Sequence, residues 1–276
     1  MPIIAERTLE RFHGIPQDRL DWRGGIGESF AYYMLRALFI VVFLSIYILI
    51  LGPPLLLYTL VTRHVDPLYW AGVKGVMFFV RAVGVKVRVE GRANIPEGVC
   101  LFVANHTSSA DAPAVVGAIP RRIAVLLKQS LFQWPIVGQA FRLAHFIPVN
   151  RRDRESAISS VEKAAEAMRA GQSFLIYPEG TRSPDGRLQE FKKGTAALAI
   201  RAGAPIVPVL CSGAHRVMAK RSMVIHPGEI LVEFLEPIDA SKYTWEERDA
   251  LRQRVHDVMA AGLPADQRPI GFPGAE

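Results

Sequence analysis

An uncharged apolar run at residues 37–61, ALFIVVFLSIYILILGPPLLLYTLV, limits what the N-terminal third of this chain can fold into. At ~1.5 Å per residue, a helix of this length crosses the ~30 Å hydrocarbon core of a bilayer. The run begins too deep in the chain, and lacks the processing pattern, to be a cleaved signal peptide. A buried helix of a soluble core is the alternative, but such helices seldom extend so far without a polar face. The run therefore predicts a membrane anchor.

Two consecutive prolines, Pro53 and Pro54, interrupt this run. Each proline lacks an N–H group and clashes with the preceding helical turn, so a single straight span is disfavoured. The sequence therefore predicts one helix over residues 30–51 and a second over residues 54–83. We expect the two helices to form a hairpin in the cytoplasmic leaflet, with a single membrane span as the alternative.

The second of these helices mixes apolar residues with Lys74 and Arg81, a composition that suits an interfacial position. Further arginines precede and follow the apolar run, so the positive charges indicate no clear inside–outside asymmetry. We assign residues 1–84 to an N-terminal segment of membrane-anchoring helices.

From residue 85 onwards, short β-rich runs alternate with helical ones. Several runs are almost continuously apolar, as expected for strands that are covered on both faces. The expected strands are 85–91, 99–105, 122–128, 144–150, 173–179, 205–211 and 229–237, and the expected helices are 154–170, 193–203 and 244–262. This alternation predicts an α/β fold with a mostly parallel sheet flanked by helices over residues 85–262. The Pro- and Gly-rich segment 263–276 is expected to be a flexible tail.

The composition narrows the class of partners. The formal net charge is +7 and the pI is about 9.6, which favours acidic partners: nucleic acid, anionic lipid or phosphorylated substrates. Hydrophobic residues make up 50% of the chain and charged residues 21%, which argues against global disorder. Two cysteines, Cys100 and Cys211, do not make a secreted disulfide framework and favour a reducing compartment.

The stretch NHTSSADAP, residues 105–113, follows the expected strand 99–105 and contains a histidine and an aspartate. A histidine can take a proton from a hydroxyl, and a carboxylate on the other ring nitrogen would fix its tautomer. One helical turn can bring Asp111 back beside His106. Two structural interpretations compete: Ser108 and Asp111 form a helix capping box, and His106 is a hydrogen-bonded structural histidine. Because the chain has no G-x-S-x-G nucleophile elbow, a catalytic pair here would activate a substrate hydroxyl directly.

Basic residues recur where other expected strands end. They lie in YPEGTRS at residues 177–183, in IPVNRR at 147–152 with Arg151 and Arg152, and in EFKKGTAALA at 190–199 with Lys192 and Lys193. Each cluster alone is compatible with a solvated surface. Ligands in open α/β sheets bind at the edge where the strands end, so the recurrence there indicates an anion site.

In this order the blocks resemble the glycerolipid acyltransferase family, most closely the 1-acylglycerol-3-phosphate acyltransferases of bacteria. NHTSSAD matches the family's N-H-x-x-x-x-D block, FIPVNR its second block, YPEGTRS its third, and IVPV at residues 206–209 its fourth. The stretch KQSLFQWPIVG, residues 128–138, is similar to the family sequence between the first two blocks. The resemblance covers roughly residues 85–240. His145 and Asn150 depart from the family's usual glycine and aspartate, which leaves the shape of the acceptor pocket open.

The resemblance implies transfer of a fatty acyl group from acyl-CoA or acyl carrier protein to the sn-2 hydroxyl of lysophosphatidic acid, giving phosphatidic acid for phospholipid biosynthesis. His106 would be the general base, oriented by Asp111. The residues expected to hold the acceptor phosphate are Arg151, Glu179, Gly180, Thr181 and Arg182, with Lys128 and Lys193 as weaker candidates for phosphate or donor contacts. No metal or cofactor is expected besides the acyl donor, because the histidines show no zinc-ligand spacing. The implied location is the inner (cytoplasmic) membrane of a bacterium, with the active site on the cytoplasmic side.

Two other functions stay open. An enzyme with another acceptor, such as glycerol 3-phosphate, a lysophospholipid with a larger head group or a lyso-aminolipid, would use the same chemistry. A membrane-bound protein that binds nucleic acid or anionic lipid would use the basic clusters as a patch. Aromatic residues do not interleave with these clusters and no nucleic-acid motif is present. We therefore expect membrane lipids and an acyl carrier as partners, and no nucleic acid.

Overall fold

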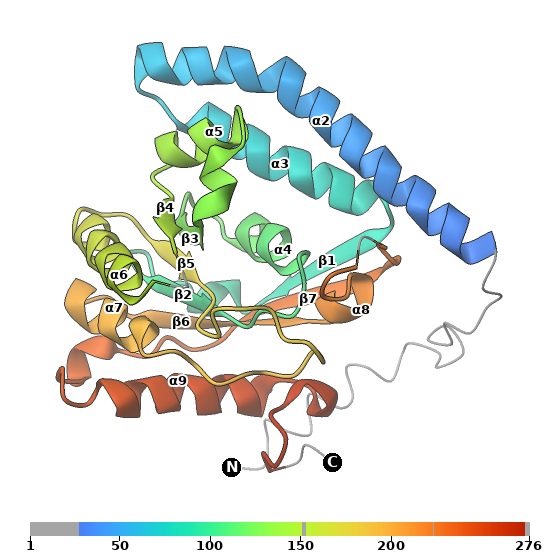
Figure 1. Cartoon of the computed structure of the whole chain (residues 1–276). Helices are drawn as coiled ribbons and strands as arrows, with labels where there is room; N and C mark the ends of the chain where they lie inside the picture. Colours follow the sequence, from blue (N-terminus) through green and yellow to red (C-terminus); the bar gives the residue numbers. More distant parts are fainter. Residues whose placement is uncertain (1–27, 151–152, 223, 274–276) are drawn as a thin grey trace.

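The computed structural model describes residues 28–150, 153–222 and 224–273. A seven-stranded sheet in the order β1-β7-β6-β2-β5-β3-β4 lies between layers of helices (Figure 1). The strands are β1 Val85–Glu90, β2 Leu101–Ala104, β3 Ala124–Lys128, β4 Ile147–Val149, β5 Phe174–Ile176, β6 Ile206–Ser212 and β7 Gly228–Phe234. The α-helices are α2 Glu28–Thr62, α3 Asp66–Ala82, α4 Asp111–Ala118, α5 Val137–Leu143, α6 Arg154–Arg169, α7 Gly194–Ala202, α8 Ala214–Val217 and α9 Arg248–Gly262. The short 3₁₀ helices are η2 Arg92–Asn94, η3 Gln129–Gln133, η4 Ala240–Lys242 and η5 Ala265–Gln267.

The sheet is mostly parallel, as the alternation of strands and helices predicts. Strands β6, β2, β5, β3 and β4 run in one direction, whereas β7 pairs antiparallel with β6 and parallel with β1. Each expected strand segment overlaps one observed strand, and every residue of the central strand β2 is buried. Because parallel strands end at the same edge, the segments that follow β2, β3, β4, β5 and β6 emerge there together. This edge carries the candidate site.

Helices cover both faces of the sheet. Helices α4 and α3 lie over one face, and α7 and α9 lie over the other (Figure 1). Two clusters of buried apolar side chains follow these layers, one containing Phe174 and Leu198 and the other containing Phe102 and Val115. Burying a side chain of this kind contributes about 1.5–3 kcal/mol each. The core thus holds the sheet edge rigidly from both faces.

The N-terminal helices differ from the expected pair. Helix α2 continues through Pro53 and Pro54 without a break, so the predicted boundary between two helices at this point is wrong. A proline removes only one hydrogen bond and strains one turn, and apolar helices with helical neighbours tolerate this loss. The chain turns later, at Arg63, whose φ is 62°. Helix α3 then begins at Asp66 with a proline in its first turn, which is a typical helix-start signal.

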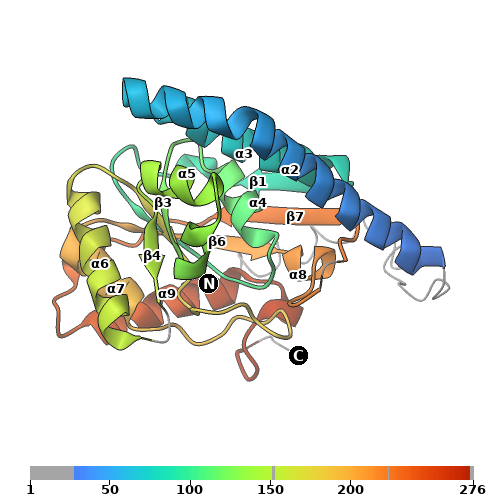
Figure 2. The same ribbon diagram turned by 45° about the horizontal axis from the view of Figure 1, so that its top comes forward.

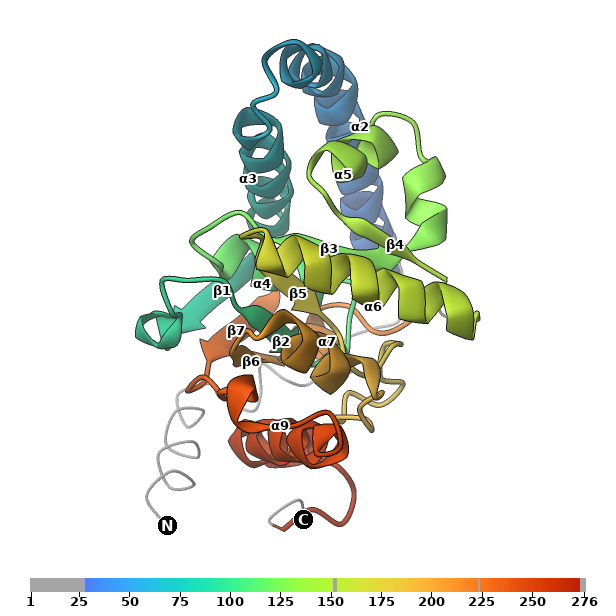
Figure 3. The ribbon, with the colours of Figure 1, turned by 90° about the vertical axis from the view of Figure 1, so that its left-hand side faces the viewer.

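Helix α2 lies along the α/β domain (Figures 2 and 3). Near one end, the Arg36 guanidinium donates to the Val83 carbonyl. Midway, the Tyr47 hydroxyl donates to a carbonyl of α3 at 2.9 Å. Near the other end, Gly52 packs so closely on Ile136 that an added Cβ would lie 2.5 Å from the isoleucine side chain. The helix is therefore attached to α3 and the residue after it at two points, and to the α/β domain through Ile136.

The rest of the α2 surface is apolar and exposed. The stretch Leu35–Thr62 has a mean hydropathy of 2.6 and is long and apolar enough to cross a membrane. Leu49, Ile50 and Val61 are 63%, 65% and 74% exposed. A large exposed apolar surface of this kind marks a contact with lipid or protein. It supports membrane association of this segment.

The C-terminal segment packs on the domain as far as the structure describes it, so the expected flexible tail is wrong for residues 263–273. Leu263 is fully buried, and the main-chain N–H of Leu188 donates to the Gln267 carbonyl at 2.8 Å. The Arg187 guanidinium donates to the Arg268 carbonyl at 2.9 Å. Hydrogen bonds from the loop at residues 187–188 to main-chain carbonyls hold this Pro- and Gly-rich stretch in place. Such long-range contacts cannot be read from the composition of the stretch.

Candidate active site

Asn105 extends the pairing of β2 and β6 beyond the regular ladder. Its side-chain amide donates to the Cys211 carbonyl at 3.0 Å, and its side-chain oxygen accepts the Cys211 N–H at 2.7 Å. The amide thus takes the place of a peptide group in the sheet. His106 follows directly after Asn105, so the hydrogen bonds of this buried residue fix the point at which His106 leaves the sheet edge.

The main chain of His106 is held by the loop after β5. Its N–H donates to Glu179 Oε1 at 2.6 Å, and its carbonyl accepts the Ser183 N–H at 2.7 Å. Glu179 is buried, and its second oxygen accepts the Gln189 side-chain amide at 2.8 Å. Burial raises the pKa of Glu179 to about 8, against the lowering effect of the His106 N–H and the other donors. Glu179 thus faces inward and joins the first and third sequence blocks.

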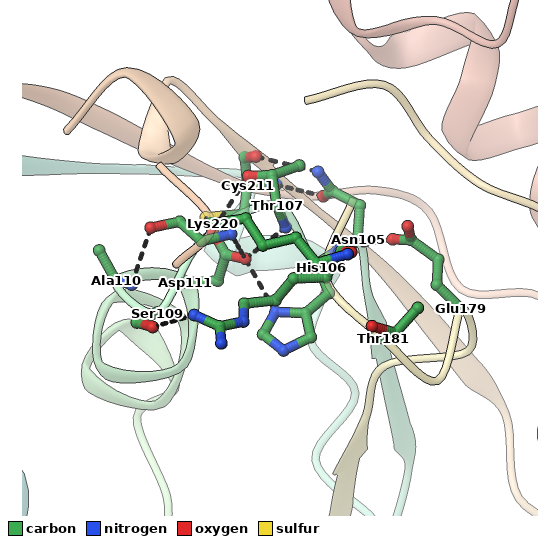
Figure 4. A network of polar contacts seen from close by, with 12 residues as sticks. Asn105, His106, Thr107, Ser109, Ala110, Asp111, Glu179, Thr181, Cys211 and Lys220 are labelled. Carbon is green, nitrogen blue, oxygen red and sulfur yellow. Dashed lines mark hydrogen bonds and ion pairs between the residues drawn. The ribbon is translucent and has the colours of Figure 1, made fainter. Parts of the chain in front are cut away.

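The imidazole ring of His106 is oriented by Asp111 and Tyr177. Nδ1 lies 2.9 Å from Asp111 Oδ2, and the ring stacks on Tyr177 with centroids 4.2 Å apart and planes 27° apart. Because the fully buried Asp111 carboxylate accepts a hydrogen bond, the Nδ1–H tautomer is favoured and Nε2 keeps its lone pair. Figure 4 shows the second ring nitrogen turned away from Asp111. Nε2 has no hydrogen-bond partner in the described part of the chain.

Asp111 owes its position to the start of α4. Its Oδ2 accepts the main-chain N–H groups of Thr107 at 2.6 Å and Ser108 at 2.7 Å. The expected capping box is only half formed, because the Ser108 hydroxyl accepts the Ala110 N–H instead of that of Asp111. Helix α4 consequently begins at Asp111 with Ala110 at its N-cap. The capping geometry and the contact with His106 use the same carboxylate oxygen, so the two interpretations of the aspartate do not exclude each other.

The loop after β5 brings cationic groups to the same edge. Gly180 has a φ of 73°, and an added Cβ would lie 2.7 Å from Lys192 Cε, so the lysine side chain crosses directly over this glycine. The Arg182 guanidinium donates to the Ser109 hydroxyl, next to the start of α4. Thr181 is exposed and its carbonyl accepts the Gln189 amide at 3.2 Å. A histidine with a free Nε2 thus lies beside a loop whose cations can attract an anion.

Comparisons with known proteins identify the family of this chain. The family model described as Acyltransferase matches residues 86–212. A 1-acyl-sn-glycerol-3-phosphate acyltransferase of Limnanthes douglasii is 33% identical over 189 residues, which cover 68% of this chain and 67% of that protein. A bacterial relative of the same name, from Borreliella burgdorferi, is 30% identical over 182 residues, which cover 65% of this chain and 72% of that protein. The chain belongs to the acyltransferase family.

A solved structure extends the likeness to the whole fold. The crystal structure of the 1-acyl-sn-glycerophosphate (LPA) acyltransferase PlsC from Thermotoga maritima superposes with a TM-score of 0.72 at 28% identity. The match covers 83% of this chain and 93% of that chain. The shared part is therefore larger than the residues matched by the family model and extends beyond the sheet core.

The other residues expected in the site do not all lie near His106 in the structure. Arg151 lies outside the described residues. Lys128 ends β3, which is separated from β2 by β5, and is exposed. Lys193 pairs with Asp249 of α9 at 3.6 Å, and its side chain is 73% exposed. Its neighbour Lys192 is the lysine that reaches the third-block loop. The sequence correctly placed Lys192 and Lys193 at the start of α7. Only the fold shows that it is the Lys192 side chain that lies at the site.

Sequence reasoning missed three residues that lie at the site. Tyr177 stacks on the imidazole, Gln189 binds Glu179, and Lys220 donates to the Arg182 carbonyl. Tyr177 opens the third block and could have been found from its place directly after a strand. No local signal points to Lys220, which lies in the segment after α8.

Proposed function

We propose that this protein transfers a fatty acyl group from acyl-CoA or acyl carrier protein to the sn-2 hydroxyl of lysophosphatidic acid, giving phosphatidic acid. The observation that carries the proposal is the His106–Asp111 pair, with Nδ1 on a buried carboxylate and Nε2 free at the sheet edge. The names of the relatives supply the substrate class, and the cations of the third block suit an acceptor phosphate.

In this mechanism, His106 Nε2 takes the proton of the acceptor hydroxyl as its oxygen attacks the thioester carbonyl. The buried Asp111 carboxylate stabilises the imidazolium that forms. When the tetrahedral intermediate collapses, the carbon–sulfur bond breaks and the leaving thiolate takes the proton from the imidazolium. No acyl-enzyme is needed, because the hydroxyl attacks the donor directly.

We assign the acceptor phosphate to the loop after β5. Arg182 can bind two phosphate oxygens through its guanidinium, and the positive φ of Gly180 lets the backbone approach them. Thr181 and Arg151 complete the expected set. Glu179 is buried and hydrogen-bonded to His106, which supports a role in positioning this loop more than direct contact with phosphate.

Acyl transfer by detergent-purified protein tests the proposal. Labelled oleoyl-CoA and lysophosphatidic acid should give labelled phosphatidic acid, and His106→Ala should lower the rate about a hundredfold or more, as expected for a positioned base. His64→Ala is the matched control, since this histidine is exposed in the turn between α2 and α3. An active wild type with an equally active His106→Ala variant would refute the mechanism. Acyl carrier protein replaces CoA in a second series to identify the donor.

A different acceptor is the main alternative within the same chemistry. A panel of lysophosphatidic acid, glycerol 3-phosphate, lysophosphatidylcholine and a lyso-aminolipid, each with one acyl-CoA, ranks the candidates by kcat/KM. A clear preference for another acceptor would replace lysophosphatidic acid in the proposal. Salt-sensitive binding of anionic ligands without any acyl transfer would favour a binding protein instead.

We propose further that α2 and α3 form a hairpin in the cytoplasmic leaflet of the inner membrane of a bacterium. Contacts at Arg36 and Tyr47 attach α2 to α3 and the residue after it, and Gly52 packs on Ile136 of the domain, so a perpendicular span of α2 alone would have to break them. In sealed inside-out vesicles, a protease or a cysteine label should reach residues 1–28. Protection of this segment would favour a single span.

A further inference from the structure

The segment after α8 is held against the candidate site at two points. The Ser108 hydroxyl, from the first sequence block, donates to the Met218 carbonyl at 2.7 Å. Two residues later, Lys220 Nζ donates to the main-chain carbonyl of Arg182 in the third block. Figure 4 shows the Lys220 side chain among those of His106, Thr107 and Asp111. The active-site loops themselves therefore place this lysine, which lies outside all the sequence blocks.

No carboxylate in the described part of the chain neutralises the charges of Lys220 and Arg182. Within residues 28–150, 153–222 and 224–273, neither side chain has a carboxylate at ion-pair distance. The nearby acids are already used, because Asp111 binds His106 and Glu179 binds the His106 N–H and Gln189. The Arg182 guanidinium donates to a hydroxyl and Lys220 to a carbonyl, both neutral groups. Two such cations, on segments joined by the contact of Lys220 with the Arg182 main chain, create a field that attracts an anion.

The hydrogen-bonding capacity of the two cations exceeds what the protein uses. A lysine ammonium has three donors, and Lys220 directs one of them to the Arg182 carbonyl. An arginine guanidinium has five donors in a planar fork, which matches two oxygens of a phosphate. The remaining donors can therefore share the oxygens of one phosphate group, the guanidinium taking two and the ammonium the third.

We propose that Lys220 binds the acceptor phosphate together with Arg182 and makes the enzyme select a phosphomonoester over a phosphodiester head group. This inference rests on the proposed function. A phosphomonoester carries a charge of about −1.5 to −2 and three acceptor oxygens, enough for both cations. A phosphodiester has a single charge and two non-bridging oxygens, so Lys220 would gain little from it. Lys220 is thus a specificity-determining residue outside the family blocks.

The test compares Lys220→Met, Lys220→Arg and wild type on two acceptors with saturating oleoyl-CoA. For lysophosphatidic acid, Lys220→Met should raise KM about tenfold to a hundredfold, the range expected for a lost hydrogen bond to a charged group, with kcat within about twofold. For lysophosphatidylcholine, kcat/KM should change by less than about twofold, so the selectivity between the two acceptors falls. Lys220→Arg should restore most of the affinity, because it restores the charge.

Lys163→Met is the matched control. It removes the same charge from an exposed position on α6, away from the sheet edge, and so reports the general effect of net charge on binding to an anionic lipid. Equal effects of Lys220→Met and Lys163→Met would overturn the proposal. A parallel loss of kcat with both acceptors would also overturn it, because that result indicates that Lys220 only supports the Arg182 loop.

Inhibition by inorganic phosphate separates this inference from the proposed function. Phosphate should compete with the acceptor in wild type, and its inhibition constant should rise about tenfold or more in Lys220→Met. This readout applies to whichever acceptor the wild type uses, so a failed assignment of lysophosphatidic acid would not hide it. An inhibition constant that does not change in Lys220→Met would refute the role of Lys220 even if phosphatidic acid is the product.

Discussion

His106 and Asp111 are held by hydrogen bonds within the stretch between β2 and α4 and from the loop after β5, whereas Arg182 and Lys220 have no carboxylate partner in the described ranges. The first pair is what a general base requires, since the ring must already point at the hydroxyl before reaction. The second pair is what a binding site requires, since its charge must stay available for the ligand. The side of the site with His106 and Asp111 is therefore rigid, and the side with Arg182 and Lys220 keeps its charge for the substrate. We call these the rigid side and the binding side.

Asp111→Asn should give the largest effect, on the rigid side. The single carbonyl oxygen of an asparagine can still accept the N–H groups of Thr107 and Ser108, but the side chain carries no negative charge to stabilise the imidazolium of His106. We expect kcat to fall about a hundredfold or more, with little change in KM for the acceptor. Steady-state kinetics check this, with Asp257→Asn on the exposed part of α9 as the control. If Asp111→Asn changed only KM, Asp111 would act in substrate binding, and the rigid side and the binding side would not differ in role.

Arg182→Lys should act on the binding side. Lysine keeps the charge but cannot bind two oxygens of one phosphate in a plane, so kcat/KM for lysophosphatidic acid should fall about tenfold, mainly through KM. Arg254→Lys, at an exposed position of α9, is the control. If kcat falls as steeply as it does in Asp111→Asn, the guanidinium acts in the chemical step, and the two sides are not separate.

Glu179→Gln should change how the stability of the rigid side depends on pH. Burial raises the pKa of Glu179 from 4.5 in the reference state to about 8, so the folded protein holds a proton that the unfolded chain loses. The stabilising contribution of this group is therefore complete below about pH 4.5 and is lost as pH rises through 8. Thermal unfolding in detergent from pH 5 to 9 should show a weaker fall of stability with pH in Glu179→Gln. Identical pH slopes would mean that Glu179 is ionised across this range.

Tyr177→Phe should have the smallest effect. The Tyr177 hydroxyl is buried and has no hydrogen-bond partner in the described ranges, while the ring stacks on His106. Removing an unpaired hydroxyl should leave kcat within about twofold and stability equal to or up to about 1 kcal/mol above that of wild type. Tyr177→Ala, which also removes the ring, should lower kcat several-fold. A large loss in Tyr177→Phe would reveal a polar role for this hydroxyl.

How far the sequence predicts the site depends on the distance between partners along the chain. His106 and Asp111 are five residues apart, and a strand end followed by a helix start is sufficient to bring them together. Glu179 lies 73 positions from His106, whose N–H it accepts. Lys220 lies 38 positions from Arg182, to whose carbonyl it donates. No pattern of neighbours encodes such contacts, because they exist only once β5 and β6 lie beside β2.

By itself the sequence determined the α/β class, the approximate position of each strand, the long apolar helix that is a candidate membrane anchor, and the local His106–Asp111 pair. These features follow from periodicity, turn residues and short-range hydrogen bonds, which act within a few residues. Only the tertiary structure decided that α2 continues through its prolines, that β7 runs against β6, and that Lys192 and not Lys193 reaches the site. Those outcomes depend on packing between distant segments, where a favourable contact outweighs the local preference of the chain.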